Sequence, residues 1–364
     1  MSQQALADAP TPTTAPSALR TSPRRVRAWA TGFALSAALL AVSVLSAGSG
    51  QFPASPAEVL AGFWHGVTGT GTSESALLDA TLWTVRFPRL VLGLLVGGAL
   101  GLGGALMQGV FANPLAEPGV IGIGSGAAVG ACTVIVLGLG SGSPFILPAA
   151  AFVSGLAVTL LVYWLARGSG SSTVLTLVLT GIAVNAVAGA VISFLVFVAD
   201  TSSREQVIFW QMGSLNGATW SAVASTACII VPATLGVLLL AGRLDLLALG
   251  DSAASHSGVN VPRLRVLSIV AVALLTSAAV AHAGMIGFVG LIVPHALRLF
   301  TGPSHRSLLP LSALGGSLLL AVADLVSRTA IPYADLPIGI FTALVGGPVF
   351  FILLRTTLKK QGVL

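Results

Sequence analysis

From residue 118 to residue 166 the chain reads PGVIGIGSGAAVGACTVIVLGLGSGSPFILPAAAFVSGLAVTLLVYWLA, without a single Asp, Glu, Lys or Arg. Residues 168–199 form a second stretch that lacks all four charged residue types. A water-soluble domain needs charged groups on its surface, so uncharged stretches of this length indicate that lipid surrounds the chain. The apolar stretches are continuous and do not alternate in short pieces. They therefore predict membrane-spanning helices of the inner-membrane type.

The rest of the chain has the same character, with 55% hydrophobic and 8% charged residues. A spanning helix takes about 20 residues. Small residues let helix backbones approach one another, so the 43 glycines favour a tightly packed bundle. The predicted fold class is an all-α membrane protein with inverted-repeat halves. Its ten transmembrane helices are expected at residues 28–47, 90–109, 121–139, 146–165, 174–198, 221–240, 266–282, 286–300, 308–326 and 338–354.

Basic residues are shared unequally between the two sides of these spans. With ten spans both termini lie on one side, and that side receives thirteen of the 17 Lys and Arg residues. The other side receives only Arg86, Arg89, Arg204 and Arg328. Cytoplasmic loops carry an excess of Lys and Arg, so both termini are predicted to be cytoplasmic. This bias accounts for the net charge of +6 without any nucleic-acid partner.

The ends of the chain differ in composition from its centre. Residues 1–26 are rich in Ala, Pro, Thr and Ser and then basic, which predicts a disordered cytoplasmic tail. Residues 27–358 are the predicted ten-helix domain, and residues 359–364 a cytoplasmic C-terminal tail. A signal peptide at residues 24–48 is the alternative, and its cleavage would leave nine spans. Residues 49–85 are expected to form an external loop with a short amphipathic helix at 56–66.

No pattern in the chain indicates catalysis, a cofactor or a metal site. Its two cysteines lie far apart within apolar spans, and its five histidines lack the spacing of a metal motif. The glycine cluster at 122–126 lacks the Gly-Lys-Ser/Thr of a phosphate loop, so no ATP site is evident. The span centres hold almost no ionisable residues, which argues against an ion-coupled carrier. Three carboxylates lie at span ends or in loops, namely Glu117, Asp324 and Asp335.

Three stretches carry a family resemblance. The first is RFPRL at 86–90, followed by GALMQ at 104–108 and NPLAEPG at 113–119. The second is GMIGFVGLIVPHALR at 284–298. The third is ADLVSR at 323–328, followed by DLPIG at 335–339 and GGPVF at 346–350. Together and in this order they resemble the FecCD-type permeases, the membrane subunits of ATP-binding-cassette (ABC) importers for iron–siderophores, haem and vitamin B12. The resemblance covers roughly residues 28–356.

The resemblance implies a multi-pass permease of the cytoplasmic membrane that works by alternating access and is not itself an enzyme. Its implied partners are ATP-binding-cassette ATPase subunits, an extracytoplasmic substrate-binding protein, membrane lipid, and a second permease copy or paralogue. A ferric siderophore is the expected cargo, because it is the commonest substrate of the family. Haem or vitamin B12 is the alternative cargo. An ion-coupled secondary carrier is the alternative function.

The resemblance also assigns two contact sites. Arg86 and Arg328 match the arginines that meet acidic residues of the binding protein, a task that suits the planar guanidinium fork. The cytoplasmic loop at 243–265 matches the segment that docks on the ATPase. Asp251 is expected to cap its second helical piece, and Ser257 stands where the family usually has Leu. The coupling residues are Leu247, Ala248, Leu249, Gly250, Asp251, Ala254 and Gly258.

The remaining motif residues are expected to shape the helices. Proline fixes φ and lacks an N–H, so the motif prolines are expected at span edges. Arg89 is expected to anchor a span edge, Glu117 to hold a turn by hydrogen bonds, and the glycines at 284, 287 and 290 to share one helix face. The set comprises Pro88, Arg89, Asn113, Pro114, Glu117, Pro118, Gly287, Gly290, Pro294, His295, Arg298, Pro337 and Gly339.

Overall fold

The computed structural model describes residues 23–50, 52–71, 75–167, 174–331 and 333–360. Within these residues the chain is helical apart from turns and one isolated β-bridge between Ile331 and Ala334. The long helices are α1 (Pro23–Gly48), α4 (Phe87–Val110), α6 (Ile146–Ala166), α7 (Val174–Val198), α9 (Trp220–Leu247), α11 (Val261–Ala283), α13 (His305–Thr329) and α14 (Ile338–Lys360). The shorter helices are α2 (Pro56–Thr68), α3 (Ala76–Thr81), α5 (Ile123–Val136), α8 (Thr201–Met212), α10 (Asp251–His256) and α12 (Val289–Thr301). Three single turns complete the chain, a π-helical turn η1 (Leu82–Arg86) and the 3-10 turns η2 (Pro118–Ile121) and η3 (Leu139–Gly142).

The predicted all-α membrane fold is confirmed, and each predicted span corresponds to one helix. In the described part of the chain, eight helices are long and apolar enough to cross a membrane. Helices α5 and α12 are shorter, with 14 and 13 residues. At 1.5 Å per residue each of these two covers only about 20 Å, less than the hydrocarbon thickness of about 30 Å. The connections that precede them therefore supply non-helical backbone inside the bundle.

Several predicted boundaries are wrong. Helix α1 begins at Pro23 and α14 runs to Lys360, so helix extends into residues that were predicted to belong to the two tails. Residues 1–22 and 361–364 lie outside the described residues. The predicted external loop ends early, because a helical path runs without a break from Ala76 to Val110. Helix α9 continues to Leu247, into the predicted coupling loop. The short helix expected at residues 56–66 is present as α2.

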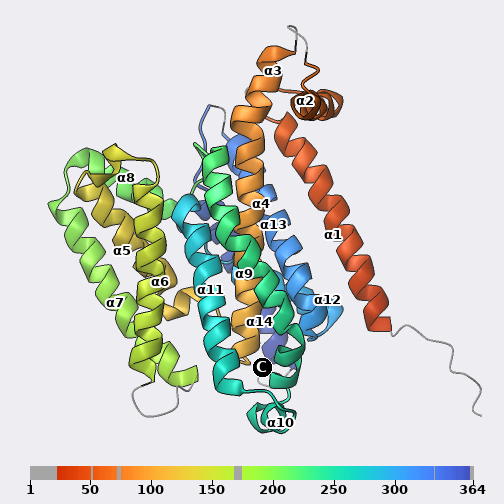
Figure 1. The fold of residues 1–364 in the computed structure, drawn as a ribbon, viewed down its shortest axis with the longest axis vertical. Helices are drawn as coiled ribbons and strands as arrows, with labels where there is room; N and C mark the ends of the chain where they lie inside the picture. The colour runs from red at the N-terminus through yellow and green to blue at the C-terminus, as the bar shows by residue number, and fades with distance from the viewer. Residues whose placement is uncertain (1–22, 51, 72–74, 168–173, 332, 361–364) are drawn as a thin grey trace, which may run out of the picture.

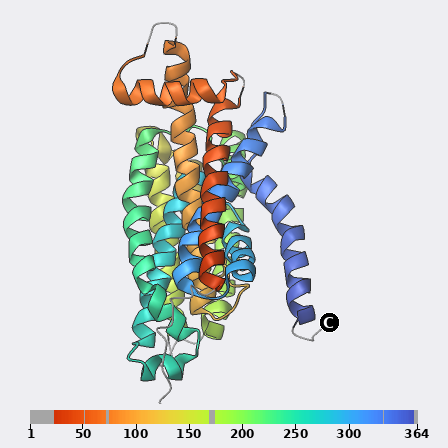
Figure 2. The same ribbon diagram turned by 90° about the vertical axis from the view of Figure 1, so that its right-hand side faces the viewer.

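Helix α4 lies at the centre of the bundle, against α13, α11, α12 and α9 (Figure 1). Helices α5, α6, α7 and α8 form a second group beside it, and α1 leans against the opposite side. Figure 2 shows α14 standing apart from the other spans. Glycines make the central contact close, as the composition predicted. A Cβ on Gly97 or Gly101 of α4 would overlap backbone oxygens of Gly316 or Ser312 in α13.

The π-helical turn at Leu82–Arg86 has a local cause in Pro88. In this turn the Phe87 N–H donates to the Leu82 carbonyl, five residues back. The next donor in that register would be Pro88, which has no N–H, so the Trp83 carbonyl loses its helical partner. The indole N–H of Trp220 donates to this carbonyl instead, at 2.7 Å. The bond ties the start of α9 to the start of α4.

Candidate functional site

The first and second motifs meet where α4 crosses α12. Gly104 lies so close to Gly290 that a Cβ on Gly104 would overlap the Gly290 carbonyl. The Gly290 carbonyl would normally accept a hydrogen bond from residue 294, but Pro294 has no N–H. The fully buried Gln108 amide donates to the carbonyls of Gly290 and Leu291, at 3.3 and 3.2 Å. Pro294 lies inside α12, so the prediction that it stands at a span edge is wrong.

Glu117 joins the first motif to the second. The backbone amide of Phe288, the N-cap of α12, lies near its carboxylate. The expectation that Glu117 holds its own turn by hydrogen bonds stays a prediction, and in the structure its carboxylate lies near the second motif. Phe288 has a φ of 68°, which is rare for a residue with a bulky side chain.

Phe288 also brings the third motif into this junction. A Cβ on Gly346 of α14 would meet the Phe288 side chain at 2.6 Å, so the two residues pack directly together. Gly284 and Gly287 lie in the non-helical connection before α12. The expectation that they share one helix face with Gly290 is therefore wrong. The three motifs thus come together around α12, which packs against both α4 and α14.

Beside this junction three non-helical segments pair their backbone N–H and carbonyl groups with one another. The Ile338 N–H donates to the Gly213 carbonyl at 3.0 Å, and the Ser214 N–H donates to the Ala283 carbonyl at 2.8 Å. Pro337 stands just before α14, as expected of a proline at a span edge. Gly339 lies against the carbonyl oxygens of α8 and of the connection before α12, where a Cβ would overlap. Irregular backbone is tolerated at membrane depth only where it is paired in this way.

A buried ion-pair cluster lies toward the end of the bundle that carries α2. Arg89 Nε lies 2.9 Å from Asp324 Oδ1, and Arg89 Nη1 lies 2.8 Å from Asp335 Oδ2. Arg328 Nε lies 3.5 Å from the second oxygen of Asp324. Asp324 is only 3% exposed, so both of its oxygens need these partners. Arg89 thus links α4 to α13 and to the segment before α14, which is more than the span-edge anchor expected.

Arg86 and Arg328 hold the end of α1. Arg86 donates to the carbonyls of Ala47 and Phe52, and Arg328 donates to the carbonyls of Ser46 and Ser49. The last carbonyls of a helix have no partner within it, so arginine donors stabilise that end. Both side chains are largely buried, although they line a cavity of about 710 Å³ that also contains the Arg89 cluster. The two residues that the resemblance pairs do lie side by side.

The predicted coupling segment forms a short projection at the opposite end of the bundle (Figure 1). Leu247 ends α9, the turn Ala248–Gly250 follows, and α10 then starts. Asp251 is the first residue of α10 and makes no cap; its carboxylate lies 3.0 Å from Arg265 Nη2 in α11. The capping expectation is therefore wrong, because Gly250, with a φ of 104°, occupies the N-cap position. Within the projection Ala254 is buried and Leu249 is 72% exposed, while Gly258 (φ 81°) closes the turn after α10.

The other motif residues shape the turn after α4 and the end of α12. The side chain of Asn113 accepts a hydrogen bond from the Leu115 N–H at 2.9 Å, with Pro114 between them. Pro118 opens η2, as expected at a helix start. His295 is buried and Arg298 is half-buried. Within the described residues no three His, Cys, Asp or Glu side chains are grouped to hold a metal ion.

The model of the FecCD transport family matches residues 24–356, the region that contains every motif described above. The chain belongs to this family. It is 41% identical over 292 residues to the hemin transport system permease protein of Yersinia pestis, covering 77% of this chain and 85% of that protein. It is also 41% identical over 291 residues to the cobalamin import system permease protein of Halobacterium salinarum, covering 78% and 75%. A solved structure described as an inward-facing conformation of a metal-chelate type ABC transporter matches with a TM-score of 0.79 and 32% identity, over 89% of this chain and 98% of that one.

This FecCD-family chain is therefore an ABC importer permease, a multi-pass protein of the cytoplasmic membrane. Permeases of this family have no ATPase site of their own and leave hydrolysis to a partner subunit. The family implies ATPase subunits, a substrate-binding protein and a second permease copy as partners. Sequence reasoning did not assign roles to Gln108, Phe288, Asp324 and Asp335. A polar or charged side chain near the end of an apolar span is the signal that marks Gln108 and Asp324.

Proposed function

We propose that this permease imports a bulky metal chelate of the tetrapyrrole type, with hemin as the first candidate and cobalamin as the second. The observation that carries this proposal is the 41% identity to two permeases named for hemin and cobalamin. The ferric siderophore expected from the family remains a candidate, but neither of these two relatives is named for one. All three cargoes are large chelates, so they make similar demands on the width of the pathway.

ATPase stimulation decides between the three cargoes. The permease, its ATPase and its binding protein are placed in nanodiscs, and hydrolysis is measured with hemin, cyanocobalamin or a ferric hydroxamate siderophore. We expect hemin to stimulate hydrolysis above the level given by the empty binding protein. Stimulation by the siderophore alone would replace the tetrapyrrole proposal with the siderophore one.

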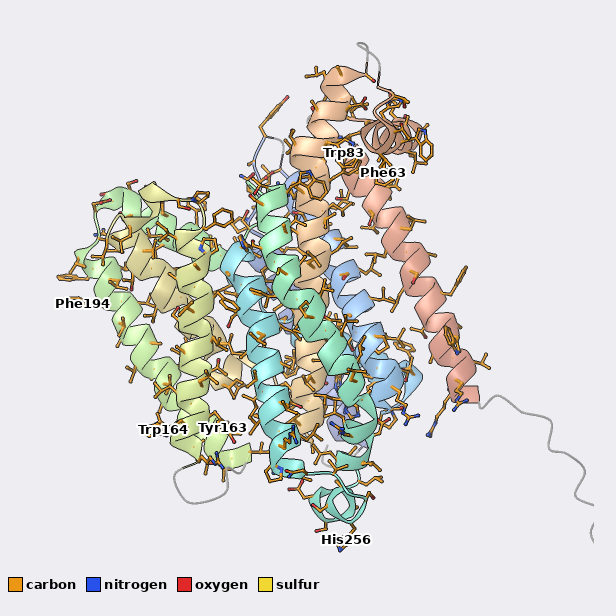
Figure 3. All side chains as sticks on the ribbon, viewed as in Figure 1. Phe63, Trp83, Tyr163, Trp164, Phe194 and His256 are labelled. Carbon is orange, nitrogen blue, oxygen red and sulfur yellow. The ribbon has the colours of Figure 1, made fainter. Side chains whose placement is uncertain are left out.

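We infer that the α10 end faces the cytoplasm and the α2 end faces outward. Of the basic residues in the described part of the chain, only Arg86, Arg89, Arg204 and Arg328 lie toward the α2 end. The positive-inside rule then places α10 in the cytoplasm, where an ATPase is available to it. A cysteine at position 256, on the tip of α10 (Figure 3), should be labelled by a membrane-impermeant thiol reagent only after the cells are opened. Labelling of intact cells would reverse the orientation.

We propose that the α10 projection, residues 247–258, docks on the ATPase. Its exposed Leu249 and its tie to α11 through Asp251 and Arg265 support this, because force transmission needs a rigid contact. A Leu249→Glu change puts a charge into the apolar contact and should reduce uptake about tenfold, as for an interface hot spot. Gly250→Pro should act more strongly, since proline cannot adopt a positive φ.

Uptake and hydrolysis in proteoliposomes test this contact together. The control is Arg167→Glu, which adds a negative charge at an exposed position of the same end but beyond α6. The docking proposal requires uptake to fall in Leu249→Glu and to stay normal in Arg167→Glu. Equal uptake in the two variants would refute it.

We propose that acidic residues of the binding protein engage Arg86 and Arg328 at the cavity on the α2 end. Both guanidinium groups line that cavity and lie beside each other, which supports a shared contact. Their bonds to the end of α1 mean that docking competes with holding this helix end. The double change Arg86→Glu with Arg328→Glu should therefore weaken binding-protein association strongly, and most at low salt, where screening is least.

Surface plasmon resonance on nanodisc complexes at two salt concentrations measures this effect. Arg204→Glu is the control, because Arg204 is an exposed arginine at the same end. An affinity that is unchanged in the double variant at low salt would remove the docking proposal. The melting temperature of the variant without binding protein shows whether the end of α1 has loosened independently.

We propose that the second permease copy or paralogue packs against α14. Figure 2 shows this helix apart from the bundle, and its exposed side chains include Leu344, Phe351 and Ile352. A large exposed apolar face on a helix that few neighbours cover is typical of a subunit interface. A Leu344→Cys variant should form a disulfide-linked dimer on oxidation. Failure of several α14 cysteines to cross-link would place the interface elsewhere.

A further inference from the structure

A groove lies between the end of α1, helix α2 and the start of α4. It has a volume of about 320 Å³. All of its lining side chains except Ser43 are apolar or aromatic. They come from α1, α2, the η1–α4 segment and α9, and include Leu40, Val44, Phe63 and Trp83. No charged side chain lines the wall, so the groove favours an uncharged, apolar occupant.

Aromatic contacts build the floor of this groove. The Trp83 ring stacks on Phe63 with centroids 6.0 Å apart and meets Phe87 edge-on at 5.3 Å. The Trp83 indole N–H donates to the Gly62 carbonyl at 2.9 Å, which ties η1 to α2. Its polar atom is thus satisfied, so Trp83 presents apolar ring surface to the groove. The π-helical turn before Pro88 sets this position of Trp83.

The groove lies at the depth of the hydrocarbon and opens onto the lipid-facing surface. Measured from Ala28, after the basic residues of α1, about 20 residues reach the far edge of the hydrocarbon near Ala47. Leu40 and Val44 therefore lie within the second half of the crossing. Leu40 is 68% exposed on the outer face of α1, so the groove is continuous with the surface that lipid covers.

Helix α2 forms the roof of the groove and lies nearly at right angles to the spans (Figure 2). A Ser55–Glu58 capping box fixes its start, and Phe63 and Trp64 are exposed on its sides. An amphipathic helix with this orientation and composition is typical of one that lies in the membrane interface. Gly62 and Gly66 let it settle onto Leu82 and Trp83, because a Cβ at either position would overlap these side chains.

We propose that this groove binds one acyl chain of a membrane lipid, with α2 lying in the interface above it. The apolar wall supplies the contact, and its continuity with the lipid-facing side of α1 supplies the entry. The bound chain fills the space between α1 and α4 below α2. The site is independent of the transported cargo and of the direction in which the protein faces.

Quenching of tryptophan fluorescence by brominated acyl chains tests the site. The full-length chain is placed in nanodiscs made of phosphatidylcholine with or without bromine on the acyl chains. Emission is compared between the natural chain and its Trp83→Phe variant, and the difference is the signal of Trp83. We expect bromine to remove most of this signal, although the ring is half-buried. Trp29, which is 81% exposed on α1, serves as the reference for contact with bulk lipid through a Trp29→Phe variant.

A plugging variant separates the groove from general lipid contact. Ser43→Phe places a ring inside the groove and should abolish the quenching of Trp83, while the quenching of Trp29 stays the same. Ala37→Phe adds the same ring to an exposed face of α1 and should change neither. Three results would each overturn the proposal. They are no quenching of Trp83 by brominated lipid, quenching by acrylamide in water instead, and quenching that survives Ser43→Phe.

Discussion

Replacing Asp324 with Ala is expected to lower the free energy of unfolding by about 3–5 kcal/mol, the usual cost of breaking a buried ion pair from one side. Asp324 is 3% exposed and faces Arg89 on one oxygen and Arg328 on the other. Without it, two largely buried guanidinium groups lose their compensating charge. The link between α4 and α13 at this end would then weaken.

Asp335→Ala is the matched control for this change. Asp335 also pairs with Arg89, at 2.8 Å, but its side chain is 37% exposed. Water can replace the Asp335 carboxylate as a partner of Arg89, so its loss should lower the free energy of unfolding by only about 1 kcal/mol or less. Unfolding of the purified variants in detergent, followed by tryptophan fluorescence, gives both values. Equal losses of unfolding free energy in the two variants would show that burial does not determine how much each ion pair contributes to stability.

Replacing Gly104 with Ala is expected to prevent stable folding, at a cost of about 3 kcal/mol or more. The added methyl group would overlap the backbone carbonyl of Gly290, which cannot move aside as a flexible side chain can. If α12 moved away to relieve this overlap, Gln108 would lose its hydrogen bond to the Gly290 carbonyl, which has no helical partner because of Pro294. Little correctly assembled protein should be recovered on size-exclusion chromatography.

Gly236→Ala is the control for this second prediction. Gly236 lies inside α9, and a Cβ there meets no atom within 4 Å. Alanine favours a helix more than glycine does, so this change should be neutral or slightly stabilising. A normal yield of Gly104→Ala would show that α4 and α12 are not packed as closely as described.

Hydropathy predicted the helices well because a membrane leaves the backbone few alternatives. Spans such as 174–198 are uniformly apolar, and their helices begin and end where the sequence indicates. The start of the helix between residues 49 and 90 is harder to predict. The helix that enters the membrane as α4 begins at Ala76, in a segment with polar residues, where Trp83 makes tertiary hydrogen bonds to α2 and α9.

The misplaced residues share a physical cause. Pro294 was expected at a span edge on local rules, but Gln108 compensates for its missing N–H from a distant part of the sequence. Asp251 was expected to cap α10, but it pairs with Arg265 fourteen residues later. Arg86 and Arg328 match a family pattern, and no local feature of the sequence indicates that both side chains hold the end of α1. Such contacts depend on the packing of several helices, which periodicity and spacing do not specify.

Uptake by proteoliposomes tests most directly the claim that this chain is the permease of an ABC importer. Vesicles containing the chain and its ATPase receive hemin-loaded binding protein outside, with either ATP inside or an imposed proton or sodium gradient and no ATP. We predict uptake that requires internal ATP and the binding protein and that stops when the ATPase carries a substitution abolishing hydrolysis. Uptake that follows an ion gradient without ATP would contradict the account and identify a secondary carrier.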